Sequence, residues 1–228
     1  MINKLPRWVE IGGFFLALIA GCVNAIGLLG FKHQAVSHLT GTSTLLGLEL
    51  ANGAIGESVH LLFIMLGFVL GAAYSSAVIG NVALKLGRRY SVALVSEALL
   101  LVLAMYCLFT GSNTGHILAS AACGLQNAMT STYSGAVVRT THVSGLFTDL
   151  GVIIGLRLRG QPADKRRVIL YITLIAGFII GGTVGALGFE NLGFFALLMP
   201  AGLAALMALT YWIYWHSSSA YAQRANDG

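Results

Sequence analysis

Charged residues are scarce in this sequence, and their scarcity decides its class. Of 228 residues, 13 are Lys or Arg and 8 are Asp or Glu, so 9% are charged, whereas a soluble domain carries roughly 25%. Hydrophobic residues make up 57% of the chain. This composition excludes an ordinary soluble domain. We therefore predict an all-α integral membrane protein whose solvent is the lipid bilayer.

Reactive and ligand-binding residue sets are missing as well. The three cysteines, Cys22, Cys107 and Cys123, lie in apolar stretches, which favours small buried side chains over a disulfide or a metal site. No nucleophile–base pair, P-loop or metal-ligand set is present. We therefore expect no enzyme activity, cofactor or metal. We also expect no nucleic-acid partner, because the net charge of +5 is explained by basic residues in cytoplasmic loops.

Long apolar runs are abundant instead. Runs of about 20 apolar residues are typical of transmembrane helices. The sequence predicts six of them, at 9–29, 58–80, 90–110, 115–137, 167–187 and 192–215.

One polar segment occurs twice in this apolar chain. SHLTGTSTLLG at 37–47 and THVSGLFTDLG at 141–151 are identical at five of eleven positions, and both contain histidine. GCVNA at 21–25 likewise matches GLQNA at 124–128, and GFVLG at 67–71 matches GFIIG at 177–181.

These matches keep the same order along the chain. The chain is therefore predicted to be one membrane domain of two similar halves, 1–111 and 112–228, an arrangement familiar in transporters. The glycines of the GFVLG and GFIIG segments form GxxxG pairs, which should allow close helix packing.

Each polar segment leads into a short helical stretch, 40–51 or 144–156. About 12 helical residues span about 18 Å, against about 30 Å of hydrocarbon. If neither stretch crosses, twelve Lys and Arg residues are cytoplasmic and only Lys32 is outside; if both cross, eight are inside and five outside. The positive-inside rule favours the first arrangement. We predict six transmembrane helices plus two re-entrant half-helices in an inverted 3+3 repeat, with N- and C-termini cytoplasmic.

The polar residues suit helices that begin inside the membrane. The first N–H groups of a helix lack intrahelical partners, and an unsatisfied group in hydrocarbon costs several kcal/mol. We expect Thr40 and Ser144 to be the N-caps. Gly41 and Gly145 would let another backbone or a ligand come close.

In an inverted repeat both half-helices point their N-termini at the bilayer centre. Each brings the positive end of a helix dipole, and His38 and His142 lie just before the caps. This combination favours an anion or a carboxylate. The candidate substrate-binding residues are the motif residues and two matching asparagines, namely His38, Thr40, Gly41, Thr44, His142, Ser144, Gly145, Thr148, Asn24 and Asn127.

Structural roles for the same residues remain open. Thr, Ser and His can cap and pin two broken helices without any ligand. Asn24 and Asn127 can cross-link helices by hydrogen bonds, which we favour slightly over ligand contact.

Two acids lie in the apolar segments. Asp149 shares a helix face with Gly145, and Glu97 lies in the third predicted helix. Intramembrane acids usually face a cavity or a partner, so both are candidates for proton coupling, although a buried neutral acid is an equal alternative. Their candidate partners are His38, His142 and Arg139.

The segments TGTSTLLGLEL, GLQNA and SGLFTDLG resemble the YoaK family of uncharacterised bacterial membrane proteins, a domain-of-unknown-function family. The resemblance covers nearly the whole chain. It implies a multi-pass protein of the bacterial inner membrane and no particular substrate. The family pattern has Asn in place of His38 and Thr42, Tyr in place of His142 and Asp in place of Asn24.

The leading hypothesis is a small-solute transporter or channel with an anionic or polar substrate bound between the two half-helix N-termini. The alternative is a non-transporting membrane scaffold, sensor or assembly partner. A transporter needs a wet cavity at the two histidines, open to one side, whereas a scaffold would have this region dry and closed. The expected partners are the lipid bilayer, the solute and a second copy of the chain.

Overall fold

The computed structural model describes residues 8–30, 36–80, 88–134 and 138–226, and these residues form helices and no strand. The elements are α1 (Trp8–Leu29), α2 (Leu39–Ala51), α3 (Ile55–Ile79), α4 (Arg88–Phe109), α5 (Thr114–Ser134), α6 (Val143–Leu158), α7 (Lys165–Leu192), the 3-10 helix η3 (Gly193–Leu197) and α8 (Leu198–Asn226). Every predicted helical range has a counterpart, so the all-α prediction is confirmed. Residues 135–137 of the predicted range 115–137 lie outside the described residues.

Four segments of the described chain are long and apolar enough to cross a membrane: Trp8–Leu29, Ile55–Ile79, Arg89–Phe109 and Lys165–Tyr214. The last has 50 residues and contains α7, η3 and most of the apolar part of α8. These segments make the protein a multi-pass helical membrane protein. α5 is not among them, because it carries polar residues such as Ser120 and Gln126, both completely buried.

The predicted helix 192–215 is wrong at both ends. Gly193 has φ +57°, a conformation that glycine adopts readily and that ends helices, and α7 stops there. The chain then makes the η3 turn before α8 begins at Leu198. Pro200 lies in the first turn of α8, where its missing N–H breaks no intrahelical bond.

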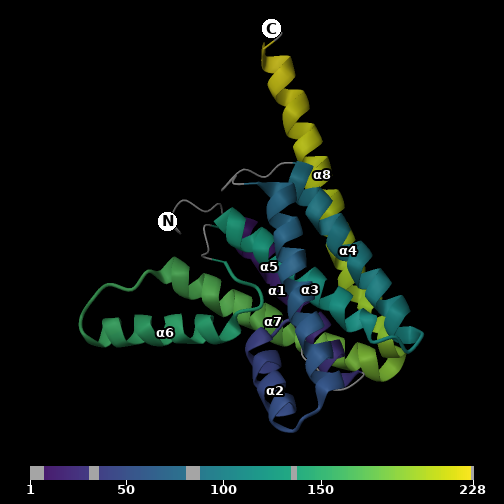
Figure 1. Cartoon of the computed structure of the whole chain (residues 1–228). Coiled ribbons are helices and arrows are strands. Elements are labelled where there is room, and N and C mark those ends of the chain that lie inside the picture. Colours follow the sequence, from purple (N-terminus) through teal and green to yellow (C-terminus); the bar gives the residue numbers. More distant parts are fainter. Residues whose placement is uncertain (1–7, 31–35, 81–87, 135–137, 227–228) are drawn as a thin grey trace.

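The long helices pack in two main pairs, α1 with α7 and α3 with α5, while α4 packs against both α5 and α8. The two short helices pack at the outside of this bundle, α2 on α3 and α6 on α7. Figure 1 shows α6 running beside the first part of α7, away from the other helices, and the far end of α8 projecting beyond the bundle. Leu146 is the one buried residue of α6, and Thr42 the one of α2.

The two main helix pairs make equivalent backbone contacts through glycine. A Cβ added at Gly21 of α1 would overlap the carbonyl oxygen of Phe178 in α7, and one added at Gly124 of α5 would overlap that of Phe68 in α3. Gly21 and Gly124 occupy matching positions of the two halves, as do Phe68 and Phe178.

The GxxxG glycines repeat this equivalence. A Cβ at Gly67 would lie 2.7 Å from the Ile117 oxygen, and one at Gly177 would lie 2.6 Å from the Phe14 oxygen. In the same way, a Cβ at Gly71 would overlap the Ala121 oxygen, and one at Gly181 the Leu18 oxygen. The predicted role of these glycines in close packing is therefore confirmed.

Buried polar side chains tie the helices together. Ser120 of α5 donates to the Ile64 carbonyl of α3 at 2.9 Å, and the Gln126 side-chain amide of α5 donates to the Leu16 carbonyl of α1 at 2.6 Å. Such interhelical bonds stabilise bundles in lipid, where water offers no alternative partner. α5, which belongs to the second half, is thus fixed to two helices of the first half.

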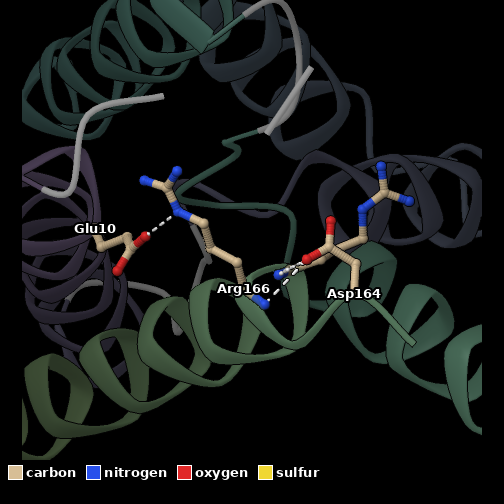
Figure 2. A network of polar contacts seen from close by, with 4 residues as sticks. Glu10, Asp164 and Arg166 are labelled. Atoms are coloured by element: carbon tan, nitrogen blue, oxygen red, sulfur yellow. Dashed lines mark hydrogen bonds and ion pairs between the residues drawn. The ribbon is translucent and has the colours of Figure 1, made fainter. Parts of the chain in front are cut away.

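The start of α7 is held by two polar contacts, shown in Figure 2. Asp164 is the N-cap and accepts from the backbone N–H groups of Arg166 and Arg167 at 3.0 and 3.3 Å. The Arg166 guanidinium forms an ion pair with Glu10 of α1 at 2.7 Å. These contacts fix the end of the α1–α7 pair beside α6.

Candidate functional site

The two copies of the polar motif meet at one cavity of about 180 Å³. We call it the central cavity. Its lining comes from the two connections α1–α2 and α5–α6, from the starts of α2 and α6, and from α3 and α5. The lining residues are Ser37, His38, Leu39, Thr40, Phe68, Asn127, Thr141, His142 and Ser144. Residues about a hundred positions apart in the sequence are therefore neighbours, and both histidines face the same space.

The histidines, not Thr40 and Ser144, are the N-caps of the short helices. α2 begins at Leu39 with His38 as its cap, and α6 begins at Val143 with His142 as its cap. The predicted caps are wrong by two residues. At α2 the reason is that the His38 imidazole accepts from the first turn as a hydroxyl would. In both helices Thr40 and Ser144 lie inside the first turn and line the cavity.

The two caps differ in their hydrogen bonds. The Gly41 N–H donates to His38 Nδ1 at 3.1 Å, whereas the His142 side chain makes no capping bond. The first N–H groups of α6 are therefore not satisfied by their cap side chain.

Gly41 and Gly145 make room for these imidazole rings. A Cβ at Gly41 would lie 2.8 Å from His38 Nδ1, and one at Gly145 would overlap His142. The expectation that these glycines admit another backbone or a ligand is therefore incomplete, because each local histidine occupies that space.

The matching asparagines are placed differently. Asn24 of α1 accepts from the Ser37 hydroxyl at 2.7 Å, so it holds the wall of the central cavity without lining it. Asn127 of α5 lines the cavity, and its buried Oδ1 has no hydrogen-bond partner among the described residues. A buried amide oxygen without a partner is costly.

The matching threonines donate back into their own helices. Thr44 bonds to the Thr40 carbonyl and Thr148 to the Ser144 carbonyl, both at 3.0 Å. Neither residue lines the central cavity.

A second, wider cavity of about 510 Å³ lies between α6 and the start of α7. We call it the α6–α7 cavity. Its lining is mostly polar and consists of Arg139, His142, Gly145, Leu146, Thr148, Asp149, Arg167 and Tyr171. His142 lines both cavities, so the central cavity adjoins an open, polar space on the side where α7 begins.

The two candidate coupling acids are far from equivalent. Asp149 lies in the α6–α7 cavity with two of its expected partners, His142 and Arg139, and interacts with Tyr171. Glu97 of α4 is 1% exposed and lines neither cavity, and its Oε2 has no hydrogen-bond partner in the part of the chain that the structure describes. Only Asp149 is therefore placed near the motif.

Sequence reasoning missed several lining residues. Ser37 and Thr141 are the first residues of the two motif copies, so their match was a usable signal. Phe68, Arg167 and Tyr171 gave none, because only the packing of α3 on α5 and of α7 on α6 brings them to the cavities.

Comparison with known proteins identifies the family. Residues 12–210 match the family described as "Protein of unknown function (DUF1275)", and the chain belongs to it. A related protein is "UPF0700 transmembrane protein YoaK" of Bacillus subtilis (strain 168), which is 27% identical over 198 residues, covering 81% of this chain and 86% of the relative. No solved structure matches the chain.

Proposed function

We propose that this DUF1275 protein is a small-solute transporter or channel that holds a polar or anionic solute in the central cavity. The observation that carries the proposal is the cavity itself, which both copies of the repeated motif line. A scaffold would need no space there, and its polar groups would be paired internally. The volume of about 180 Å³ restricts the ligand to a small solute.

The chemistry of the lining suits a solute with oxygen acceptors and at least one donor. The uncapped first turn of α6 and the Thr141 hydroxyl supply donors, and the two imidazoles add further polar atoms. Asn127 Oδ1 supplies an acceptor. A small carboxylate or another oxyanion carrying an O–H or N–H group satisfies both requirements.

The proposed architecture is an inverted 3+3 repeat of six spans, with α2 and α6 as re-entrant helices. The equivalent glycine contacts of the α1–α7 and α3–α5 pairs support a two-fold relation between the halves. α2 and α6 have only 13 and 16 residues, or about 20 and 24 Å of helix. α5 crosses inside the bundle, where packing against α3, α4 and α1 supports its polar residues.

The proposed location is the bacterial inner membrane with both termini in the cytoplasm. Twelve of the 13 Lys and Arg residues are then cytoplasmic. The α6–α7 cavity would open to that side, and transport would require a second state in which the central cavity opens to the other side.

The test is solute movement in proteoliposomes. Purified protein is reconstituted and screened with labelled small carboxylates, inorganic oxyanions and polar neutral metabolites. We expect at least one class to move, and Asn127→Leu to abolish the flux because the cavity loses its acceptor. Asn191→Leu is the matched control, since Asn191 is exposed on α7 and bonds only to the Leu187 carbonyl among the contacts described.

Flux that is the same in the Asn127 variant and the parent would remove the central cavity from the route. If no solute moves and none stabilises the purified protein, the scaffold, sensor or assembly-partner alternative stands instead.

A further inference from the structure

We propose that the α6–α7 cavity is an oxyanion-binding site of its own, in which Arg139 and Arg167 grip a phosphate-like group. Both arginines line the cavity, one from the segment before α6 and one from the first turn of α7. A guanidinium group presents a planar fork of N–H donors that matches phosphate and carboxylate oxygens. Two forks facing one space form an oxyanion clamp.

The arginines are available for such a ligand. Within the described part of the chain, no carboxylate oxygen lies within 4.0 Å of either guanidinium group. The neighbouring Arg166 differs, because its guanidinium is bound to Glu10. Asp164, the other nearby acid, bonds to the backbone N–H groups at the start of α7.

Asp149 is the one carboxylate that lines the cavity. Tyr171 lines the same cavity. With two guanidinium groups and one carboxylate, the cavity has a net positive charge, and a bound oxyanion would be attracted by the arginines and repelled by Asp149.

The site belongs to one half of the protein only. Leu45 matches Asp149 and Leu61 matches Tyr171 in the first half, and Leu61 is buried. Glu57 matches Arg167, so the described residues beside α2 form no equivalent clamp. Because His142 lines both cavities, an oxyanion held there lies next to the central cavity.

Inorganic phosphate is the probe, and its affinity for the full chain in lipid-free detergent is measured by calorimetry. We expect Arg139→Gln and Arg167→Gln each to weaken binding by about tenfold or more, as loss of a charged hydrogen bond does. Arg159→Gln is the matched control, because it removes the same charge at the end of α6 outside both cavities. Asp149→Asn should tighten binding, because it removes the repulsive charge.

Arg139→Lys and Arg167→Lys control for variants that fail to fold. They keep the positive charge and lose the planar set of guanidinium N–H donors. They should bind phosphate more weakly than the parent and more tightly than the Gln variants. No phosphate binding, or equal binding by the parent and both Gln variants, would overturn the proposal. Weaker binding by Asp149→Asn would likewise overturn it, because Asp149 would then be a structural partner of the arginines.

The same chemistry occurs in free solutes and in lipid headgroups, and a second arm separates them. Phosphate binding is repeated in nanodiscs of phosphatidylcholine or phosphatidylglycerol. A phosphate affinity of the parent that is lower in phosphatidylglycerol than in phosphatidylcholine assigns the site to a headgroup, and equal affinity in the two lipids assigns it to a soluble oxyanion. Phosphate binding that Asn127→Leu retains and the Arg→Gln variants lose belongs to the α6–α7 cavity, so failure of the transport proposal and failure of this one are distinguishable.

Discussion

At the scale of single residues, His38 and His142 occupy equivalent places and stabilise their helices unequally. His38 accepts from the Gly41 N–H, and His142 makes no such bond. A cap that satisfies its helix contributes to stability, whereas one that leaves donors open prepares a binding site. The protein thus has one satisfied and one open helix start at the same cavity.

This difference predicts unequal losses of stability. His38→Ala should lower the free energy of unfolding by about 0.5–2 kcal/mol, the usual cost of an N-cap, and His142→Ala should change it little. Thermal unfolding in detergent measures both, and His38→Asn is the control because asparagine is itself a good cap. Equal losses in the two Ala variants would contradict the assigned capping.

The glycines allow a second residue-scale prediction. Gly71→Ala and Gly181→Ala should each destabilise by about 1–3 kcal/mol, because the new methyl group overlaps a backbone oxygen of the partner helix. Gly47→Ala and Gly151→Ala are matched controls, since no atom lies within 4 Å of their added Cβ and alanine is the better helix former. Tolerance of alanine at Gly71 and Gly181 would contradict the close backbone contacts.

At the scale of elements, the length of apolar runs was enough to predict the six long helical segments, because lipid allows few alternatives to a helix. Their ends depended on local groups that hydropathy does not register. α7 begins two residues before its predicted range because Asp164 caps it, and Gly193 separates it from α8. The central cavity followed from the repeated motif, while the α6–α7 cavity required the packing of α6 on α7.

The cap of α7 can be tested alone. Asp164→Ala should destabilise the protein by about 0.5–2 kcal/mol, because two backbone N–H groups lose their acceptor. Asp164→Asn should retain most of the stability, since the amide oxygen also accepts. Unfolding followed by circular dichroism reports both, and a loss in the Asn variant as large as in the Ala variant would assign the effect to charge.

At the scale of the whole molecule, the two halves share helix order, glycine contacts and motif, and differ in charge. The α6–α7 cavity holds two arginines and an aspartate, whereas leucines stand at the matching positions of Asp149 and Tyr171. The glycine contacts are thus equivalent in the two halves, whereas the charged residues of the α6–α7 cavity belong to the second half.

The path of the chain across the membrane tests this framework. If α2 and α6 are re-entrant, Asn52→Cys and Ser112→Cys should be labelled from outside, and Gln161→Cys and an N-terminal tag should be reached only from the cytoplasm. The reason is that α1, α3, α4 and α5 each reverse the side and the short helices do not. Labelling uses a membrane-impermeant maleimide on intact and lysed cells, in a variant with Cys22, Cys107 and Cys123 replaced by alanine.

The competing arrangement makes an opposite and equally definite forecast. If α2 and α6 both cross, the N-terminal tag and all three introduced cysteines lie on one side, because each half then reverses the side four times. That arrangement would also place five of the 13 Lys and Arg residues outside, against the positive-inside rule. Labelling of Asn52→Cys and Gln161→Cys from the same side would therefore remove the inverted repeat, and with it the meeting of two helix N-termini at mid-membrane.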